Sequence, residues 1–249
     1  MIPIKTCQEI DKMQRGGRIL AKIMTELAAM VSVGITTKDL DEEAGDLIRS
    51  FGATSAFKGY CGYPADACVS VNEEVVHGIP GRRRLREGDI VSVDIGIKQD
   101  GFFLDMAQTF PVGRIDTVRR RLIETAQGAL EEATKVFRRG NRLVDISRAV
   151  QVYVETRGFS VVRDFVGHGI GRALHEEPQI PNYVTKEESP LLETGMVFAI
   201  EPMINAGSWE VKVLGDGWTA VTKDKQPSAH FEHTVALTDK GPVILTQEG

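Results

Sequence analysis

The sequence lacks the features that mark several protein classes. Its only cysteines, Cys7, Cys61 and Cys68, form no CxxC pair, so neither a disulfide framework nor a zinc knuckle is predicted, and a reducing compartment is favoured. No segment approaches the roughly 20 consecutive apolar residues that cross a bilayer. The charged start, MIPIKTCQEIDKM, lacks the apolar stretch of a secretory signal. We therefore expect a soluble, cytoplasmic protein without membrane contact.

An excess of positive charge is also missing. The formal net charge of the 249 residues is -5, whereas nucleic-acid affinity depends on lysines and arginines that displace counterions. The local run of Arg82, Arg83, Arg84 and Arg86 is interpreted as a solvated surface loop rather than a binding patch. We expect no specific nucleic-acid binding.

Two helices are predicted near the start of the chain. Thr6 and Glu9 have the spacing of a capping box, and the apolar residues that follow recur at helical spacing as far as Gly34. A second helix has its apolar face between Leu40 and Phe51 and ends at Gly52. Short alternating strands follow.

The same order of elements returns later in the chain, with helices predicted over residues 118–137 and 145–156. The matched positions, each 106 residues apart, are Gly34 with Gly140, Asp39 with Asp145, Leu40 with Ile146, and Gly52 with Gly158. This offset favours two pseudo-symmetric halves of about 1–112 and 113–249. Since no linker rich in proline or serine separates them, we expect residues 1–249 to form one α+β domain, with helices outside a sheet built by both halves.

One segment, DIVSVDIGIKQDGFFLDMAQTF, has the pattern of a β-hairpin. Apolar residues alternate with polar ones, and Asp100-Gly101 is a strong two-residue turn signal. With this turn, Asp94 lies opposite Ala107 and one diagonal step from Asp105, so both aspartates share a face. Two carboxylates would then converge in an apolar setting, where like charges need a metal, a shared proton or a basic partner. Both aspartates could instead face water, but their apolar neighbours favour a metal.

Further candidate ligands come from the second half of the chain. The chain has five histidines, and His77, His168 and His175 adjoin a glycine turn or an acidic pair, where loops carry function. Glu201 and Glu232 stand in strand-like runs, in which acids are depleted, although each alone could equally be a buried salt-bridge partner.

Together these residues make an oxygen-rich set of donors. Asp94, Asp105, Glu201 and Glu232 supply carboxylates and His168 supplies an imidazole. Such a set suits manganese, iron(II) or cobalt(II) better than a structural zinc. It also suits two ions that share bridging carboxylates and activate a water as nucleophile.

At this point the sequence resembles the type I methionine aminopeptidases, which have the pita-bread fold of a curved antiparallel sheet with helices outside. The resemblance covers essentially the whole chain. It is carried by the order of the five candidate ligands and by the motifs SVNEEVVHGIP, GDIVSVDIG, DGFFLDMAQTF, VGHGIGRALHEEP, AIEPM, DGWTAVTKD and FEHT. The short segment between His175 and Glu201 leaves no room for the helical insertion of type II enzymes.

The resemblance implies a role for each residue. Asp94 would hold one ion, His168 and Glu201 the other, and Asp105 and Glu232 both. Glu201 would also shuttle a proton of the attacking water, and His77 and His175 would contact the scissile amide. The pocket for the methionine side chain would be lined by Tyr60, Tyr63, Cys68 and Trp218. Three positions depart from what is common in the family, namely His230, where glutamine is usual, Leu174 and Phe57.

The implied activity is removal of the initiator methionine from nascent proteins whose second residue is small. The expected enzyme is a monomer that associates transiently with the ribosome and acts on N-terminal methionine peptides. One alternative is a proline-specific aminopeptidase of the same fold, although such relatives usually carry an extra N-terminal domain. The other is a non-catalytic binding module, which would typically have lost ligands that are all present here.

Overall fold

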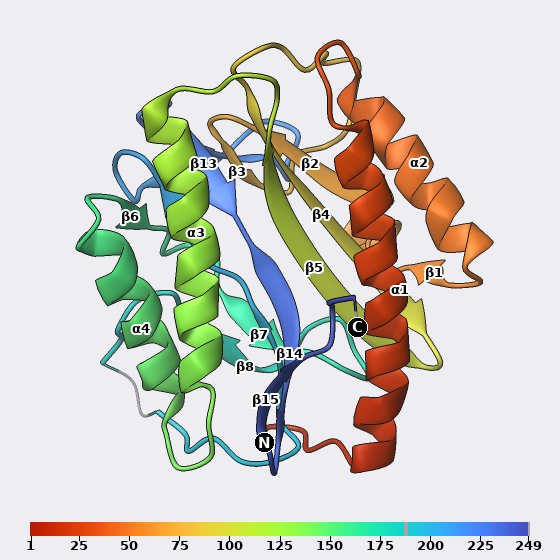
Figure 1. Ribbon diagram of the computed structural model, residues 1–249, viewed down its shortest axis with the longest axis vertical. Coiled ribbons are helices and arrows are strands. Elements are labelled where there is room, and N and C mark those ends of the chain that lie inside the picture. Colours follow the sequence, from red (N-terminus) through yellow and green to blue (C-terminus); the bar gives the residue numbers. More distant parts are fainter. Residues whose placement is uncertain (187–188, 249) are drawn as a thin grey trace.

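The computed structural model describes residues 1–186 and 189–248. The helices of this part of the chain are α1 (Cys7–Met30), α2 (Thr37–Ser50), α3 (Thr117–Val136) and α4 (Leu143–Glu155), together with the short 3-10 turn η1 (Tyr60–Gly62). Figure 1 shows them as two pairs in front of the strands, α3 with α4 at the left of the view and α1 with α2 at the right. Each pair comes from one of the two predicted halves.

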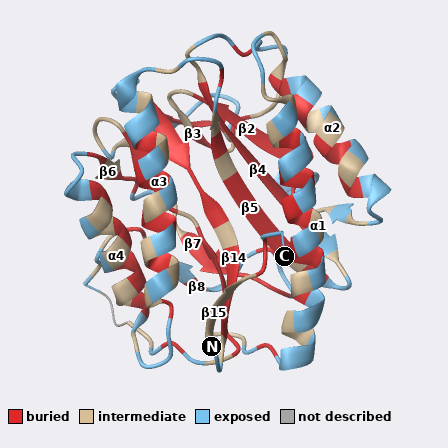
Figure 2. Cartoon of the chain, in the orientation of Figure 1, coloured by how far each residue is buried: buried red, intermediate tan, exposed pale blue. Residues whose placement is uncertain are grey.

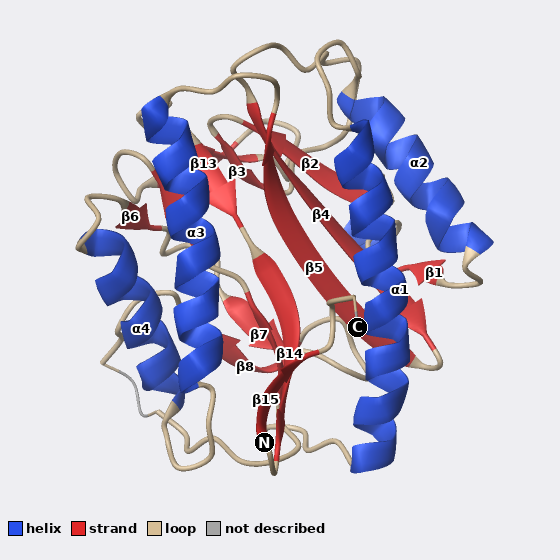
Figure 3. Cartoon of the chain, viewed as in Figure 1, coloured by secondary structure: helices blue, strands red, loops and turns tan. Residues whose placement is uncertain are grey.

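The strands form one large sheet and two small ones (Figure 3). Their bounds are β1 (Thr54–Ser55), β2 (Ala67–Val71), β3 (Glu74–Val76), β4 (Ile90–Gln99), β5 (Phe102–Pro111), β6 (Ser160–Val161), β7 (Gly167–Gly169), β8 (Glu176–Ile180), β9 (Val197–Ile200), β10 (Met203–Asn205), β11 (Val211–Val213), β12 (Ala220–Thr222), β13 (Ser228–His230), β14 (Glu232–Thr238) and β15 (Gly241–Ile244). The large sheet is antiparallel and has the order β1-β4-β5-β14-β9-β7-β8, with β2 added beside β4 and β15 beside β14. The pairing of β5 with β14 joins the two halves.

The helices begin close to where the sequence predicts. The capping box of Thr6 and Glu9 is confirmed. Helix α4 begins at Leu143, two residues before the predicted start, because Asp145 is the third residue of its first turn and accepts a hydrogen bond from the backbone N–H of Arg142 at 2.8 Å. Asp39 occupies the same place in α2, where its carboxylate accepts from the N–H of Thr36.

The four glycines predicted as helix stops are left-handed but lie beyond the helix ends. Gly52 follows the end of α2 by two residues and Gly158 the end of α4 by three, whereas Gly34 and Gly140 follow the ends of α1 and α3 by four. Gly34, Gly52, Gly140 and Gly158 have φ angles of +96°, +70°, +91° and +82°, a region that costs a glycine little and other residues more. All four positions belong to the matched set on which the proposal of two related halves rests.

Two apolar cores lie beneath the two helical pairs. One packs α1 and α2 against β2, β4 and β5, and the other packs α3 and α4 against β9 and β14. Figure 2 shows the helices buried on their sheet-facing sides and exposed on the other. Within residues 1–186 and 189–248, no helix combines the length and the apolar character needed to cross a membrane.

Candidate metal centre

Asp94 and Asp105 lie on the neighbouring strands β4 and β5 and point to the same face of the sheet. The register pairs Asp94 with Ala107 and Asp105 with Gly96, which confirms the hairpin predicted from the sequence. Both side chains are buried, with 8% and 4% of the residue surface exposed. Gly96 leaves room for the ring of Phe57, whose Cε1 lies 2.6 Å from where a β-carbon at this position would be.

Ala107 is the point at which the two halves of the site meet. On β5 it lies opposite Asp94 of β4 and also opposite Glu232, the first residue of β14. Residues opposite one another in neighbouring strands point to the same face. The small side chain of Ala107 therefore leaves space between two carboxylates that are 138 positions apart in the sequence.

His168 and Glu201 come from neighbouring strands of the second half. His168 lies in β7, opposite Ala199 of β9, and its Nδ1 donates to the backbone oxygen of Gly169 at 2.9 Å. This bond fixes the ring and leaves Nε2 free, 3.6 Å from Oε1 of Glu201. Glu201 was predicted within a strand, but β9 ends at Ile200, because the following Pro202 has no N–H for the ladder.

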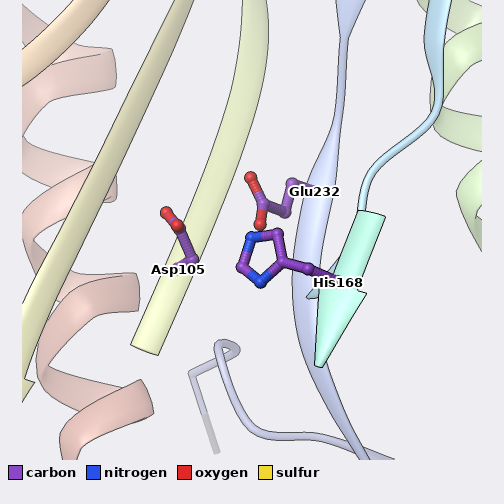
Figure 4. Close-up of side chains that lie close together, drawn as sticks. All are labelled: Asp105, His168 and Glu232. Carbon is purple, nitrogen blue, oxygen red and sulfur yellow. The ribbon is translucent and has the colours of Figure 1, made fainter. Parts of the chain in front are cut away.

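Three of these side chains are drawn in Figure 4, where His168 and Glu232 reach from β7 and β14 toward β5, the strand that carries Asp105. One ligand atom from each of the three lies within 4.8 Å of the others. Glu201, His230 and Glu232 form a second group with the same spacing. Glu232 belongs to both groups.

The site holds more acid than its surroundings balance. Among the described residues, none of the four carboxylates forms an ion pair with a lysine or arginine, and Asp94 Oδ1 and Glu232 Oε1 have no hydrogen-bond partner. Burial raises the pKa of Asp105 to about 7 and, together with repulsion from the neighbouring carboxylates, raises the pKa of Asp94, Glu201 and Glu232 well above its usual range. Partnerless buried oxygens of this kind fit a hard divalent cation.

The centre opens into a cavity of about 280 Å³. The five candidate ligands line it, as do both predicted amide-contacting histidines and all four predicted pocket residues. The hydroxyl of Tyr63 donates to the backbone oxygen of Gly78 at 3.0 Å, so its ring rather than its hydroxyl faces the cavity. That ring packs edge-on against Trp218, with ring centres 5.0 Å apart, while Tyr60, 40% exposed, lies nearer the surface.

His77 and His175 lie beside the cavity in different ways. His77 follows β3 in a left-handed conformation, with φ of 59°, and packs edge-on against Phe165 and Trp218. His175 Nδ1 lies 2.7 Å from the hydroxyl of Tyr60, and its ring centre is 4.3 Å from that of His168. Burial lowers the pKa of His77 to about 4 and that of His175 below its usual value. Both imidazoles are therefore neutral near pH 7 and can donate one N–H each.

The structure adds cavity residues that the sequence did not single out. Val76, Asp164, Phe165, Val166 and Met203 also line the cavity. Their only signal was their position, since Phe165 and Met203 stand within three residues of candidate ligands. The three positions noted as unusual, Phe57, Leu174 and His230, also line it.

Known metallopeptidases match this chain along almost its whole length. The model of metallopeptidase family M24 matches residues 11–239. Methionine aminopeptidase 1 of Bacillus subtilis is 50% identical over 247 residues, which cover 99% of this chain and 100% of the relative. Methionine aminopeptidase of Clostridium perfringens is 50% identical over 246 residues, 99% of each chain.

A solved structure is similar to this one over the whole chain. The crystal structure of methionine aminopeptidase from Thermotoga maritima superimposes with a TM-score of 0.97 at 46% identity, over 100% of both chains. The predicted pita-bread fold is thereby confirmed.

Proposed function

Since this chain belongs to metallopeptidase family M24, we propose that its catalytic centre is a pair of divalent metal ions. The chain is an enzyme that removes the initiator methionine from proteins. The observation that carries the proposed pair of metal ions is the convergence of partnerless carboxylate oxygens from both halves of the sheet on one cavity.

The ligands would divide between the two ions. Asp94 would hold one ion, and His168 and Glu201 would hold the other. Asp105 and Glu232 would serve both ions, and Glu232 belongs to both groups of donor atoms. When bound, the ions would lower the pKa of an attacking water and polarise the scissile carbonyl.

The other residues act on the peptide. Glu201, at the cavity with its side chain 13% exposed, takes a proton from the attacking water and delivers it to the leaving amine. His77 and His175 donate N–H groups to the scissile amide and to the oxygen that gains charge during attack. The aromatic rings of Tyr63 and Trp218, with Cys68 at the cavity wall, contact the methionine side chain, whose sulfur packs well against ring edges.

We propose manganese, iron(II) or cobalt(II) as the ions, because carboxylate oxygens dominate the donors. We further propose a monomer of one domain with two related halves. It would work in the cytoplasm and meet nascent chains with a small second residue during transient association with the ribosome.

A peptide assay tests the proposed centre. Metal-free protein should release methionine from Met-Ala-Ser only after manganese, cobalt or anaerobic iron(II) is added, and a proline-containing Xaa-Pro peptide should remain uncleaved. Full activity in the presence of a strong chelator would contradict the two-metal centre. Cleavage of Xaa-Pro alone would favour the proline-specific alternative, which the identity to methionine aminopeptidases over the whole chain argues against.

A variant separates catalysis from simple binding. Asp105→Ala removes a carboxylate assigned to both ions, so it should abolish metal uptake and methionine release together. The matched control is His233→Gln, on β14 next to the site. His233 bonds to Thr246 and lines a different cavity, so this variant should retain both properties.

A further inference from the structure

His230 is held rigidly at the edge of the metal centre. It is the last residue of β13, and 2% of its surface is exposed. Its backbone N–H donates to the hydroxyl oxygen of Thr109 at 2.9 Å, and the Thr109 hydroxyl donates back to the backbone oxygen of His230 at 2.8 Å. These bonds fix the backbone at His230, and its burial leaves the ring little space to turn away from the cavity that it lines.

The Nε2 atom of His230 lies between two carboxylates without bonding to either. It is 3.6 Å from Oε2 of Glu201 and 3.8 Å from Oε2 of Glu232, which is too long for a hydrogen bond. Among the described residues it has no hydrogen-bond partner. A buried ring nitrogen without a partner is costly, so its position calls for a ligand.

These separations fit a shared metal ion. Two ligand atoms that each lie about 2.1 Å from one ion are at most about 4.2 Å apart, and both distances are shorter than this limit. One donor atom each from Glu201, His230 and Glu232 lies within 4.8 Å of the other two. A neutral imidazole is also among the commonest metal ligands in proteins.

We propose that His230 is an additional nitrogen ligand of the metal centre, on the ion that Glu201 and Glu232 share. The inference rests on the proposed two-metal function and adds a second imidazole beside His168. An extra nitrogen donor favours cobalt and zinc over manganese, because imidazole binds later divalent metals more strongly than carboxylate oxygen does. This chain should therefore discriminate against manganese more strongly than a chain with an amide at this position.

The number of coordinated imidazoles can be counted without an activity assay. High-spin cobalt(II) shifts the exchangeable N–H proton of each bound imidazole far outside the normal proton NMR range. We expect two such signals in the cobalt-loaded protein, one from His168 and one from His230. His230→Gln should lose one of the two, whereas the control His233→Gln should keep both.

A binding measurement gives the second readout. Calorimetric titration of the metal-free protein should show that His230→Gln weakens cobalt binding by about tenfold or more, while manganese affinity falls less. A single shifted signal in the unmodified protein, or two signals that persist in His230→Gln, would overturn the role of His230 and leave the two-metal centre intact. Absence of cobalt binding to the unmodified protein would overturn both.

Discussion

Lys5 and Glu176, 171 positions apart in the chain, form an ion pair whose side chains are 1% and 9% exposed. The Glu176 carboxylate also accepts the backbone N–H groups of Arg172 at 2.7 Å and Ala173 at 3.2 Å. The N-terminal segment is thereby tied to the loop that carries His175. Burial lowers the pKa of Lys5, while the bond to Glu176 opposes that shift.

Loss of the Lys5 ammonium should loosen this loop. Lys5→Met leaves the Glu176 carboxylate buried without its cation, so we expect the free energy of unfolding to fall by about 3 to 5 kcal/mol. Because His175 adjoins Glu176, kcat should fall more than KM rises. Urea unfolding and Met-Ala-Ser kinetics measure the two effects.

A second ion pair serves as the control. Arg172, on the same loop, pairs with Glu9 of α1, but the Arg172 side chain is 56% exposed, so Arg172→Met should cost less than about 1 kcal/mol. Equal losses of kcat in the two variants would show that the buried pair has no special part in placing His175.

Removing the charge of Asp105 should stabilise the metal-free protein in a pH-dependent way. Burial raises the pKa of Asp105 from an ordinary 3.8 to about 7, so the folded state holds a proton that the unfolded state releases. The Asp105 carboxyl therefore does not destabilise the folded protein below pH 3.8. Above that pH the destabilisation grows, and at about pH 7 it reaches about 4 kcal/mol. Asp105→Asn should match the unmodified protein at pH 4 and exceed it at pH 8.

Metal-free samples at the two pH values give the comparison directly. The difference in unfolding free energy between the variant and the unmodified protein isolates the effect of Asp105. The buried histidines contribute equally to both proteins, and their lowered pKa values make stability rise with pH rather than fall. A stability difference that is the same at pH 4 and pH 8 would contradict the buried, raised-pKa state of this carboxyl.

The sequence predicts local structure well because its signals are local. The turn at Asp100 and Gly101 fixes the register that places Asp94 opposite Ala107, and each predicted helix stop is a glycine with positive φ. Helix α4 begins two residues before its predicted start, since Asp145 caps the helix from its first turn.

The assembly of the site depends on contacts between segments that are distant in the sequence, and the periodicity of the sequence does not encode these contacts. Nothing in the sequence shows that Ala107 would lie beside Glu232, or that Lys5 would reach Glu176. His230 was recognised only as an unusual residue. Its placement between two carboxylates follows from the pairing of β13 with β10 and from its bonds to Thr109.

The packing of α1 on the end of the chain depends on Gly17. A β-carbon there would lie 2.1 Å from the backbone oxygen of Leu245, and backbone cannot move aside as a side chain can. Gly17→Ala should therefore destabilise the protein by several kcal/mol, despite a gain of about 1 kcal/mol in helix propensity. Thermal unfolding measures the loss, and Gly16→Ala is the neighbouring control.

In the control variant, Gly16→Ala, the new β-carbon would meet a side chain rather than the backbone. A β-carbon at Gly16 would meet the Cδ2 atom of Leu104 at 2.9 Å, and that side chain can change rotamer. Gly16→Ala should therefore cost much less than Gly17→Ala, and equal melting temperatures for the two variants would refute the role given to the Leu245 backbone.

The proposed metal ligands bind the ions, and the proposed amide-contacting histidines act only on the peptide. Variants of the histidines should therefore lower turnover without changing metal binding. His175→Ala removes an N–H donor but no proposed ligand, so kcat should fall by about 10² to 10³, while the calorimetric affinity for cobalt stays unchanged. Tyr60→Phe removes only the hydroxyl 2.7 Å from His175 Nδ1, and should lower kcat far less, because the ring remains in place. If His175→Ala instead lost cobalt affinity as Asp105→Ala is expected to, His175 would belong among the ligands, and its contact with the scissile amide would have to be abandoned.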